Sequence, residues 1–392
     1  MPHTFYPLAR KNTKNYAVSF NKLYNPIRSV TTSIPPLQSK GNRPLQMSFD
    51  EHLRALVYFH LEEHASAQHL LQALEEDEFA RYQIAPKEGI KKSSFSEATN
   101  TRGLEQFMYV FEHLQKQASR ILPDCHPGLG KLVAIDGSLI DATLSMHWAD
   151  YRKGARKAKT HIGFDLNRGI PRKIFFTTGN GAERPFVNQI LSPGETGVMD
   201  RGYQCHDMFD RWQEEERLFM CRIKAKTVKT VIEVHPVEPG SIVFYDAAVL
   251  LGTDGDNQTK KPVRVVGYEF DNVRYWIATN RHDLTAEQVA TAYKLRWDIE
   301  TFFGWWKLHL KVYHLIARSE HGLMVQILAG LITYLLLAIY CHEEHNEKVS
   351  IRRVRQLRMQ IQNEFRYAPS NAENVHDFKE QNAQSESAYA KT

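Results

Sequence analysis

The chain has 392 residues, of which 42% are hydrophobic and 24% charged, and this composition is typical of an ordinary globular protein rather than a disordered or fibrous one. A chain of this length buries a sizeable core and is expected to fold as two or three units. The net charge of +5 is modest, but it is unevenly distributed.

The positive charge is concentrated at the start of the chain. No acidic residue occurs before Asp50, whereas seven cationic residues do: Arg10, Lys11, Lys14, Lys22, Arg28, Lys40 and Arg43. A segment of this kind is typical of a solvated, flexible tail, and we predict a basic flexible arm over residues 1–46. Contact of this arm with nucleic acid is the alternative.

Helices are predicted over residues 47–125. Ser48 and Glu51 form a capping box ahead of a stretch whose apolar spacing suits one long helix through Leu74. A second helical pattern ends at Pro123. Two or more helices here indicate a small all-helical domain.

Short apolar strands follow from residue 131 onward. The run KLVAID is followed by THIGFDL and PRKIFFTT, two segments joined by a turn at Asn167, Arg168 and Gly169, and this pattern predicts a strand and then a β-hairpin. GVMD and LFMCRIKA are further strands on either side of the helical stretch HDMFDRWQEEER. Strand, hairpin, strand, helix and strand is the order of a mixed α/β sheet.

The following segment is almost wholly β in character and is interpreted as an insertion. Helix returns at Thr285, whose spacing to Gln288 forms a second capping box. The predicted division of the chain is a basic arm (1–46), a helical domain (47–125), a first core part (131–226), a β insertion (227–284), a second core part (285–345), and a basic helix with a polar tail (346–392).

Cysteine usage and hydropathy bear on the compartment. The four cysteines form no CxxC pair, so neither a zinc site nor a disulfide framework is indicated, and a cytoplasmic protein without a secretory signal is predicted. The apolar stretch Leu323–Tyr340 is at the lower length limit for a membrane span and contains Gln326 and Thr333. We interpret it as a buried helix of a globular core, so no membrane partner is expected.

The segment AYKLRWDIETFFGWWK, residues 292–307, is predicted to be one amphipathic helix. At about 100° per residue, Tyr293, Arg296, Glu300 and Lys307 fall within one stripe about 60° wide. The opposite stripe is apolar and consists of Leu295, Ile299, Phe302 and Trp306. A solvated face with ion pairs between residues four apart is the simpler interpretation of the polar stripe.

Two aspartates favour a metal site over a simple solvated face. Asp136 ends the apolar strand KLVAID, and Asp200 ends GVMD. A carboxylate at the end of a buried strand is costly unless it is paired or binds a cation. Asp136 and Asp200 together with the helical Glu300 suit two Mg²⁺ ions that share oxygen ligands, with Mn²⁺ as a substitute. These three residues are therefore the candidate catalytic and metal-binding set.

A cluster of basic residues lies between the first strand and the hairpin. Its members are Arg152, Lys153, Arg156, Lys157 and Lys159. A solvated loop is the simpler interpretation, but beside Asp136 we expect contact with the DNA backbone, which weakens as salt rises. The first four are candidate DNA-binding residues together with Arg296 and Lys307.

These motifs resemble the YREK-signature branch of the DDE transposases of bacterial insertion sequences, the insertion-sequence family four type. Tyr293, Arg296, Glu300 and Lys307 satisfy the full spacing of that signature, and AIDGS and MDRGY resemble the two aspartate blocks. The match covers about residues 131–307.

The resemblance implies a ribonuclease-H-like, retroviral-integrase-like core of class α/β with a β-rich insertion and an N-terminal helical domain. By the same analogy, the helical domain over residues 47–125 is expected to bind DNA. It implies that Asp136, Asp200 and Glu300 bind metal, and that Arg296 and Lys307 hold phosphate while Tyr293 positions the same strand. The implied partners are double-stranded DNA, as transposon ends and target, and a second copy of the chain. The implied activity is Mg²⁺-dependent cleavage and strand transfer at terminal inverted repeats.

Two alternatives remain at this point. One is a nuclease on the same fold that cuts DNA without joining it. The other is a catalytically silent protein, a domesticated binder of DNA ends. The intact carboxylate triad favours the catalytic interpretations.

Overall fold

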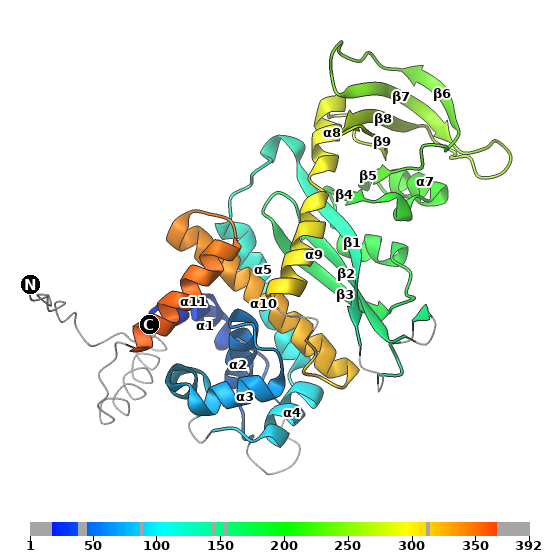
Figure 1. The fold of residues 1–392 in the computed structure, drawn as a ribbon. Helices are drawn as coiled ribbons and strands as arrows, with labels where there is room; N and C mark the ends of the chain where they lie inside the picture. Colours follow the sequence, from blue (N-terminus) through cyan, green and yellow to red (C-terminus); the bar gives the residue numbers. More distant parts are fainter. Residues whose placement is uncertain are drawn as a thin grey trace, which may run out of the picture.

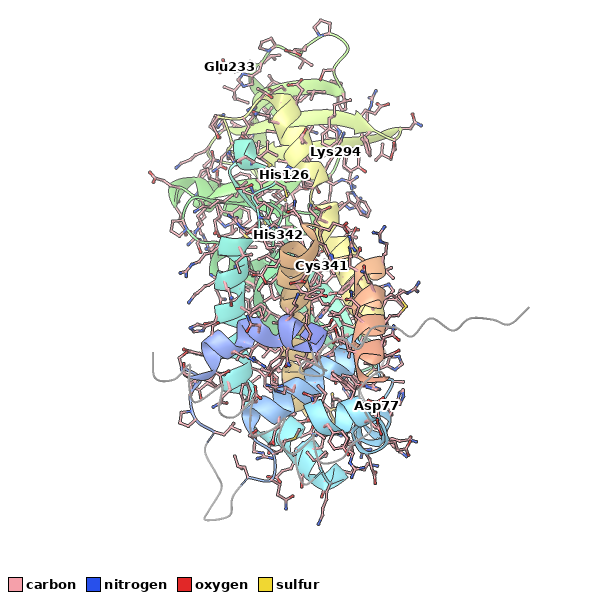
Figure 2. All side chains as sticks on the ribbon, turned by 90° about the vertical axis from the view of Figure 1, so that its left-hand side faces the viewer. Asp77, His126, Glu233, Lys294, Cys341 and His342 are labelled. Atoms are coloured by element: carbon pink, nitrogen blue, oxygen red, sulfur yellow. The ribbon has the colours of Figure 1, made fainter. Side chains whose placement is uncertain are left out.

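The computed structural model describes residues 18–37, 45–86, 89–142, 146–149, 151–152, 155–310 and 314–366. Within this part the chain forms a helical body joined to one nine-stranded mixed sheet (Figure 1). Glu233 and Asp77 lie near opposite ends of the molecule, at the tip of the sheet and in the helical body (Figure 2). The α/β class predicted from the sequence is confirmed.

The helical body surrounds one long apolar helix. Its members are α1 (Val18–Thr31), α2 (Phe49–Leu61), α3 (Ala67–Glu76), α4 (Lys92–Thr101), α5 (Leu104–Ile121), α10 (Glu320–His345) and α11 (Ile351–Arg366). The capping box of Ser48 and Glu51 is present at the start of α2. The single helix expected through Leu74 is wrong, because the chain turns after α2, where Glu63 has a left-handed φ of 56°.

Helix α1 differs from the flexible arm expected over residues 1–46. Phe20, Leu23 and Ile27 are fully buried at 0% exposure, and Ser19 donates a hydrogen bond of 2.6 Å from Oγ to Glu364 in α11. These apolar residues recur at helical spacing, so they bury one face of α1 against the other helices. Residues 1–17 and 38–44 of the expected arm lie outside the described part.

Helix α10 is the predicted core helix. It is long and apolar enough to cross a membrane, but 89% of its most apolar window is buried inside the molecule. Gln326 is also fully buried, and its side chain bonds to the backbone of His314 and Ile316. The apolar surface of α10 is buried against α2, α4 and α5.

Five strands form one half of the nine-stranded sheet. They are β1 (Lys131–Asp141), β2 (Lys157–Asp165), β3 (Ile170–Thr178), β4 (Glu195–Met199) and β5 (Leu218–Arg222), in the order β3-β2-β1-β4-β5. Strand β2 is antiparallel to β1 and β3, while β1, β4 and β5 are parallel. The predicted hairpin is confirmed, with Gly169 at a φ of 71° in its turn.

The β insertion continues the same sheet. It consists of β6 (Lys229–Val234), β7 (Val243–Leu251), β8 (Val263–Phe270) and β9 (Val273–Thr279). Strand β9 pairs antiparallel with β5, through Met220 with Thr279 and Arg222 with Ile277. The helices α6 (Val187–Ile190) and α7 (His206–Glu214) lie between β3 and β5 in the chain.

The predicted helix over residues 292–307 is two helices in the structure, α8 (Ala286–Lys294) and α9 (Trp297–His309). The amide of Arg296 bonds to the Tyr293 carbonyl at 3.1 Å, three residues back, so the helix tightens at this junction. The two helices still follow one another as a column from the insertion to the helical body (Figure 1). The Thr285–Gln288 capping box at the start of α8 is confirmed.

Candidate active site

Asp136 and Asp200 lie at the same level of the sheet, directly after the last paired residues of the parallel strands β1 and β4. Asp200 follows the end of β4, but the prediction that Asp136 ends its strand is wrong, because β1 continues to Asp141 by pairing with β2. Ile135 of β1 pairs with Met199 of β4, and each aspartate is the next residue in its chain. The amide of Gly137 donates to Asp136 Oδ1 at 2.8 Å, and the amide of Gly202 donates to Asp200 Oδ1 at 2.8 Å. The register of the sheet therefore brings the two carboxylates together.

The environment of Asp136 is partly desolvated and strongly charged. Burial raises the pKa of its carboxyl to about 7, and the Gly137 amide and the Arg296 guanidinium oppose that rise. The carboxylates of Asp200 and Glu183 raise the pKa further. Negative charge is thus concentrated at this end of the sheet.

Helix α9 places Glu300 beside the same group. Arg296 Nη2 donates to Glu300 Oε1 at 2.6 Å, across one helical turn. The Arg296 side chain is only 7% exposed, whereas that of Glu300 is 36% exposed. Ile299, Phe302 and Trp306 are buried on the opposite side of α9, as predicted, and fix the helix to the core. Glu300 is therefore held beside the sheet with its carboxylate accessible.

Tyr293 and Lys307 lie on either side of this pair. Tyr293 is 2% exposed, and its ring lies 6.5 Å from that of Tyr275 in β9, so it contacts protein here. Lys307 Nζ donates to the carbonyl oxygen of Leu139 in β1 at 2.8 Å, and burial lowers its pKa. Lys307 thus links α9 to the strand that carries Asp136.

The basic segment flanks the far end of β1. Lys157 pairs with Asp141 at 2.5 Å, and Lys157 and the exposed Arg152 both approach the Tyr151 ring, at 5.8 and 6.0 Å. Arg156 begins the return to the sheet, and its backbone carbonyl accepts from Ala142. Lys153 lies outside the described residues.

Two residues that the sequence did not indicate also belong to this region. Glu183 follows β3 and lies against Gly137, and Tyr203 follows Asp200. Both residues lie in short turns, and the local sequence pattern does not predict where such turns place their side chains. A glycine directly after Asp136 was the available signal, because a missing side chain leaves room for a neighbour.

The donor set suits a hard divalent cation. Carboxylate oxygens are the ligands that Mg²⁺ and Mn²⁺ take, and a cation relieves the crowding that raises the pKa of Asp136. Across the described ranges, no three acidic, histidine or cysteine side chains are already gathered around one point as a metal site. In this structure Glu300 forms its ion pair with the Arg296 guanidinium.

Comparison with known proteins places these residues within one matched region. The family model described as transposase DDE domain matches residues 127–336. Three relatives bear transposase names. The putative transposase for insertion sequence element IS4SA of Synechocystis sp. is 26% identical, over 64% of this chain and 72% of the relative. The probable transposase for IS5377 of Geobacillus stearothermophilus is 28% identical over 52% of this chain and 55% of the relative, and the putative transposase y4zB of Sinorhizobium fredii is 28% identical over 60% of this chain and 66% of the relative. A solved structure, a piggyBac transposase synaptic complex with hairpin DNA, aligns at 12% identity and a TM-score of 0.44, over 93% of this chain and 84% of that one.

Proposed function

The chain belongs to the transposase DDE domain family, whose model matches more than half of it, and from this premise we propose that it binds the terminal inverted repeats of an insertion sequence and catalyses DNA strand cleavage and strand transfer. The observation that carries the proposal is that Asp136 in β1 and Asp200 after β4 lie at the same level of neighbouring strands, beside the Arg296–Glu300 pair. The strand order β3-β2-β1-β4-β5 agrees with a ribonuclease-H-like core.

Asp136, Asp200 and Glu300 are proposed to hold two Mg²⁺ ions, with Mn²⁺ as a substitute. Such ions activate a water or a 3′-hydroxyl and stabilise the leaving oxygen of a phosphodiester. Three carboxylates supply the oxygen ligands and the compensating negative charge for this purpose. The accessible carboxylate of Glu300 suits a role next to DNA.

The neighbouring cations are proposed to hold DNA phosphates. Arg296 orients Glu300 through their hydrogen bond, and Lys307 places a positive charge beside the strand of Asp136. Arg152, Lys153, Arg156 and Lys157 extend this positive surface along the DNA backbone, where contacts fix position rather than sequence. Tyr293 contacts Arg296 through its ring, whose centroid lies 5.8 Å from the guanidinium carbon.

The proposed assembly is a homodimer that pairs two DNA ends in the cytoplasm. Each active site then acts on one end, and the helices of residues 47–125 contribute to recognition of the terminal repeat. The second function considered from the sequence, cleavage without joining, uses the same carboxylates and differs only in whether the 3′-hydroxyl is transferred.

The test uses the full chain and duplexes of the terminal inverted repeat that flanks its coding region. Wild-type protein is expected to cleave and join these ends in Mg²⁺, whereas Asp136→Asn, Asp200→Asn and Glu300→Gln bind them but do not cleave. Cleavage without joining would indicate a nuclease, and binding without cleavage by wild-type protein would indicate a silent end-binder. Full cleavage by any of the three variants would refute the carboxylate assignment.

A further inference from the structure

Glu183 is an acidic residue of the active-site region that belongs to none of the three motifs that carry the family resemblance. It lies in the segment between β3 and α6, at the start of a 3₁₀ turn over Arg184–Phe186. Its carboxylate reaches the backbone of β1 at the residue after Asp136. A Cβ built on Gly137 would lie only 2.7 Å from Glu183 Oε1 and 3.0 Å from its Cδ.

The segment that carries Glu183 is fixed against the turn that carries Asp200. The neighbouring Arg184 donates two hydrogen bonds, from Nε and Nη2, to the carbonyl oxygen of Gly202 at 3.2 and 3.0 Å. Gly202 in turn donates its amide to Asp200. Glu183 thus lies close to the strand of Asp136, and its neighbour Arg184 is bonded to the turn of Asp200.

A buried phenol is directed into the same space. Tyr203 is 1% exposed, and its hydroxyl makes no hydrogen bond of normal geometry within the described part of the chain. Burial raises its pKa, and the nearby charges of Glu183, Asp136 and Asp200, together with a side-chain contact with Glu183, raise it further. A buried hydroxyl without a hydrogen bond of normal geometry is costly, and its oxygen can accept one from a water bound to a cation.

We propose that Glu183 is a fourth carboxylate of the metal-binding centre, contributing an oxygen ligand directly or through a metal-bound water. This inference rests on the function proposed above. In the metal-free protein its counter-ion is Lys159, whose Nζ lies 2.9 Å from Glu183 Oε1. Lys159 also donates to the carbonyl oxygen of Gly181 at 3.2 Å, so it keeps a partner when the carboxylate turns to a metal.

The competing explanation is that Glu183 and Lys159 form only a structural ion pair. The two explanations differ in the sign of the effect at Lys159. If the pair is structural, loss of either partner disturbs the site equally. If Glu183 is a ligand, removal of the lysine charge leaves the carboxylate free and favours cation binding, because a like charge is removed from the neighbourhood of the metal.

The experiment measures Mn²⁺ affinity of the full chain without DNA, by isothermal titration calorimetry or by electron paramagnetic resonance of free Mn²⁺. The variants are Glu183→Gln, Lys159→Met and Asp136→Asn, with circular dichroism as the check on folding. Glu183→Gln is expected to weaken Mn²⁺ binding by about tenfold or more, and Lys159→Met to leave it equal to or tighter than wild type. Gly137→Ala, whose methyl group displaces the flexible end of Glu183, is expected to weaken binding as well.

The outcomes separate this inference from the proposed function. Wild-type affinity in Glu183→Gln together with a loss in Asp136→Asn overturns the role of Glu183 and leaves the triad intact. Equal losses in Glu183→Gln and Lys159→Met show a structural pair and also overturn it. Wild-type affinity in both Asp136→Asn and Glu183→Gln removes the metal site itself, and the proposed function with it. If Glu183→Gln does not fold, the result for Gly137→Ala decides.

Discussion

Arg296 donates a 2.6 Å hydrogen bond to Glu300 while its guanidinium also opposes the rise in the pKa of Asp136 that burial causes. One buried cation therefore serves two of the three candidate metal ligands. It both orients Glu300 and competes electrostatically with a divalent ion for the same negative charge.

Replacement of Arg296 by methionine is expected to separate these two effects. Without the guanidinium, Mn²⁺ should bind the DNA-free protein at least about threefold more tightly, because a nearby positive charge is gone. Cleavage of DNA ends should nevertheless fall by about tenfold or more, because Glu300 loses its orienting partner. Titration of Mn²⁺ and a cleavage time course measure the two effects. A parallel change in both would contradict the dual role.

Lys307 is predicted to contribute charge as well as structure. Lys307→Met should weaken binding of the terminal-repeat duplex and reduce the slope of log affinity against log salt by about one. Lys307→Arg keeps the charge and should retain the wild-type slope. Both are measured by fluorescence anisotropy across a salt series in Ca²⁺. An unchanged slope in Lys307→Met would leave only its hydrogen bond to Leu139 as a role.

The pKa of Asp136 predicts a specific dependence of stability on pH in metal-free protein. The folded-state pKa of about 7 lies above the ordinary value of 3.8, so between these values the folded protein keeps a proton that the unfolded chain releases. This group therefore makes the free energy of unfolding fall as pH rises through that window, by at most about 1.4 kcal/mol per pH unit. Above about pH 7 its contribution is constant.

Asp136→Asn removes this contribution and provides the comparison. Urea unfolding in EDTA between about pH 5 and pH 8 should show the variant gaining stability relative to wild type as pH rises. Other titrating groups are shared by the two proteins, so the difference isolates Asp136. A difference that does not vary with pH would show that the carboxyl titrates near its ordinary value.

Helix α1 is predicted to be part of the folded core. Phe20 is fully buried and lies 5.9 Å from the ring of Tyr24 and 5.7 Å from that of Phe79. Phe20→Ala should lower the free energy of unfolding by about 3–5 kcal/mol. Val231→Ala is the control, since Val231 is 48% exposed on β6 and should cost less than about 0.5 kcal/mol. Similar unfolding midpoints for the two variants would indicate that α1 is detached in solution.

Much of the fold followed from local sequence patterns. Both capping boxes, the hairpin turn at Gly169 and the strands of the sheet are present because each is determined by residues close together in the chain. Helix α1 differs from the sequence prediction because a stretch without acidic residues is typical of a flexible tail. The apolar face of α1 stabilises the helix only when it packs against α10 and α11, which lie far away in the sequence.

The candidate site divides in the same way. Asp136, Asp200 and Glu300 could be selected because each occupies a recognisable position on a predicted strand or helix. Glu183 could not, because its position depends on contacts of Gly137, Lys159 and Gly202 across loops far apart in sequence. The catalytic roles of all these residues remain predictions.

The pairing of β9 with β5 has a consequence for the removal of the insertion. Excision of residues 227–280 would leave one side of β5 without hydrogen-bonding partners, one strand away from the strand that leads to Asp200. A bare, apolar strand edge invites pairing with other chains. A shortened protein would therefore tend to aggregate before any effect on chemistry could be observed.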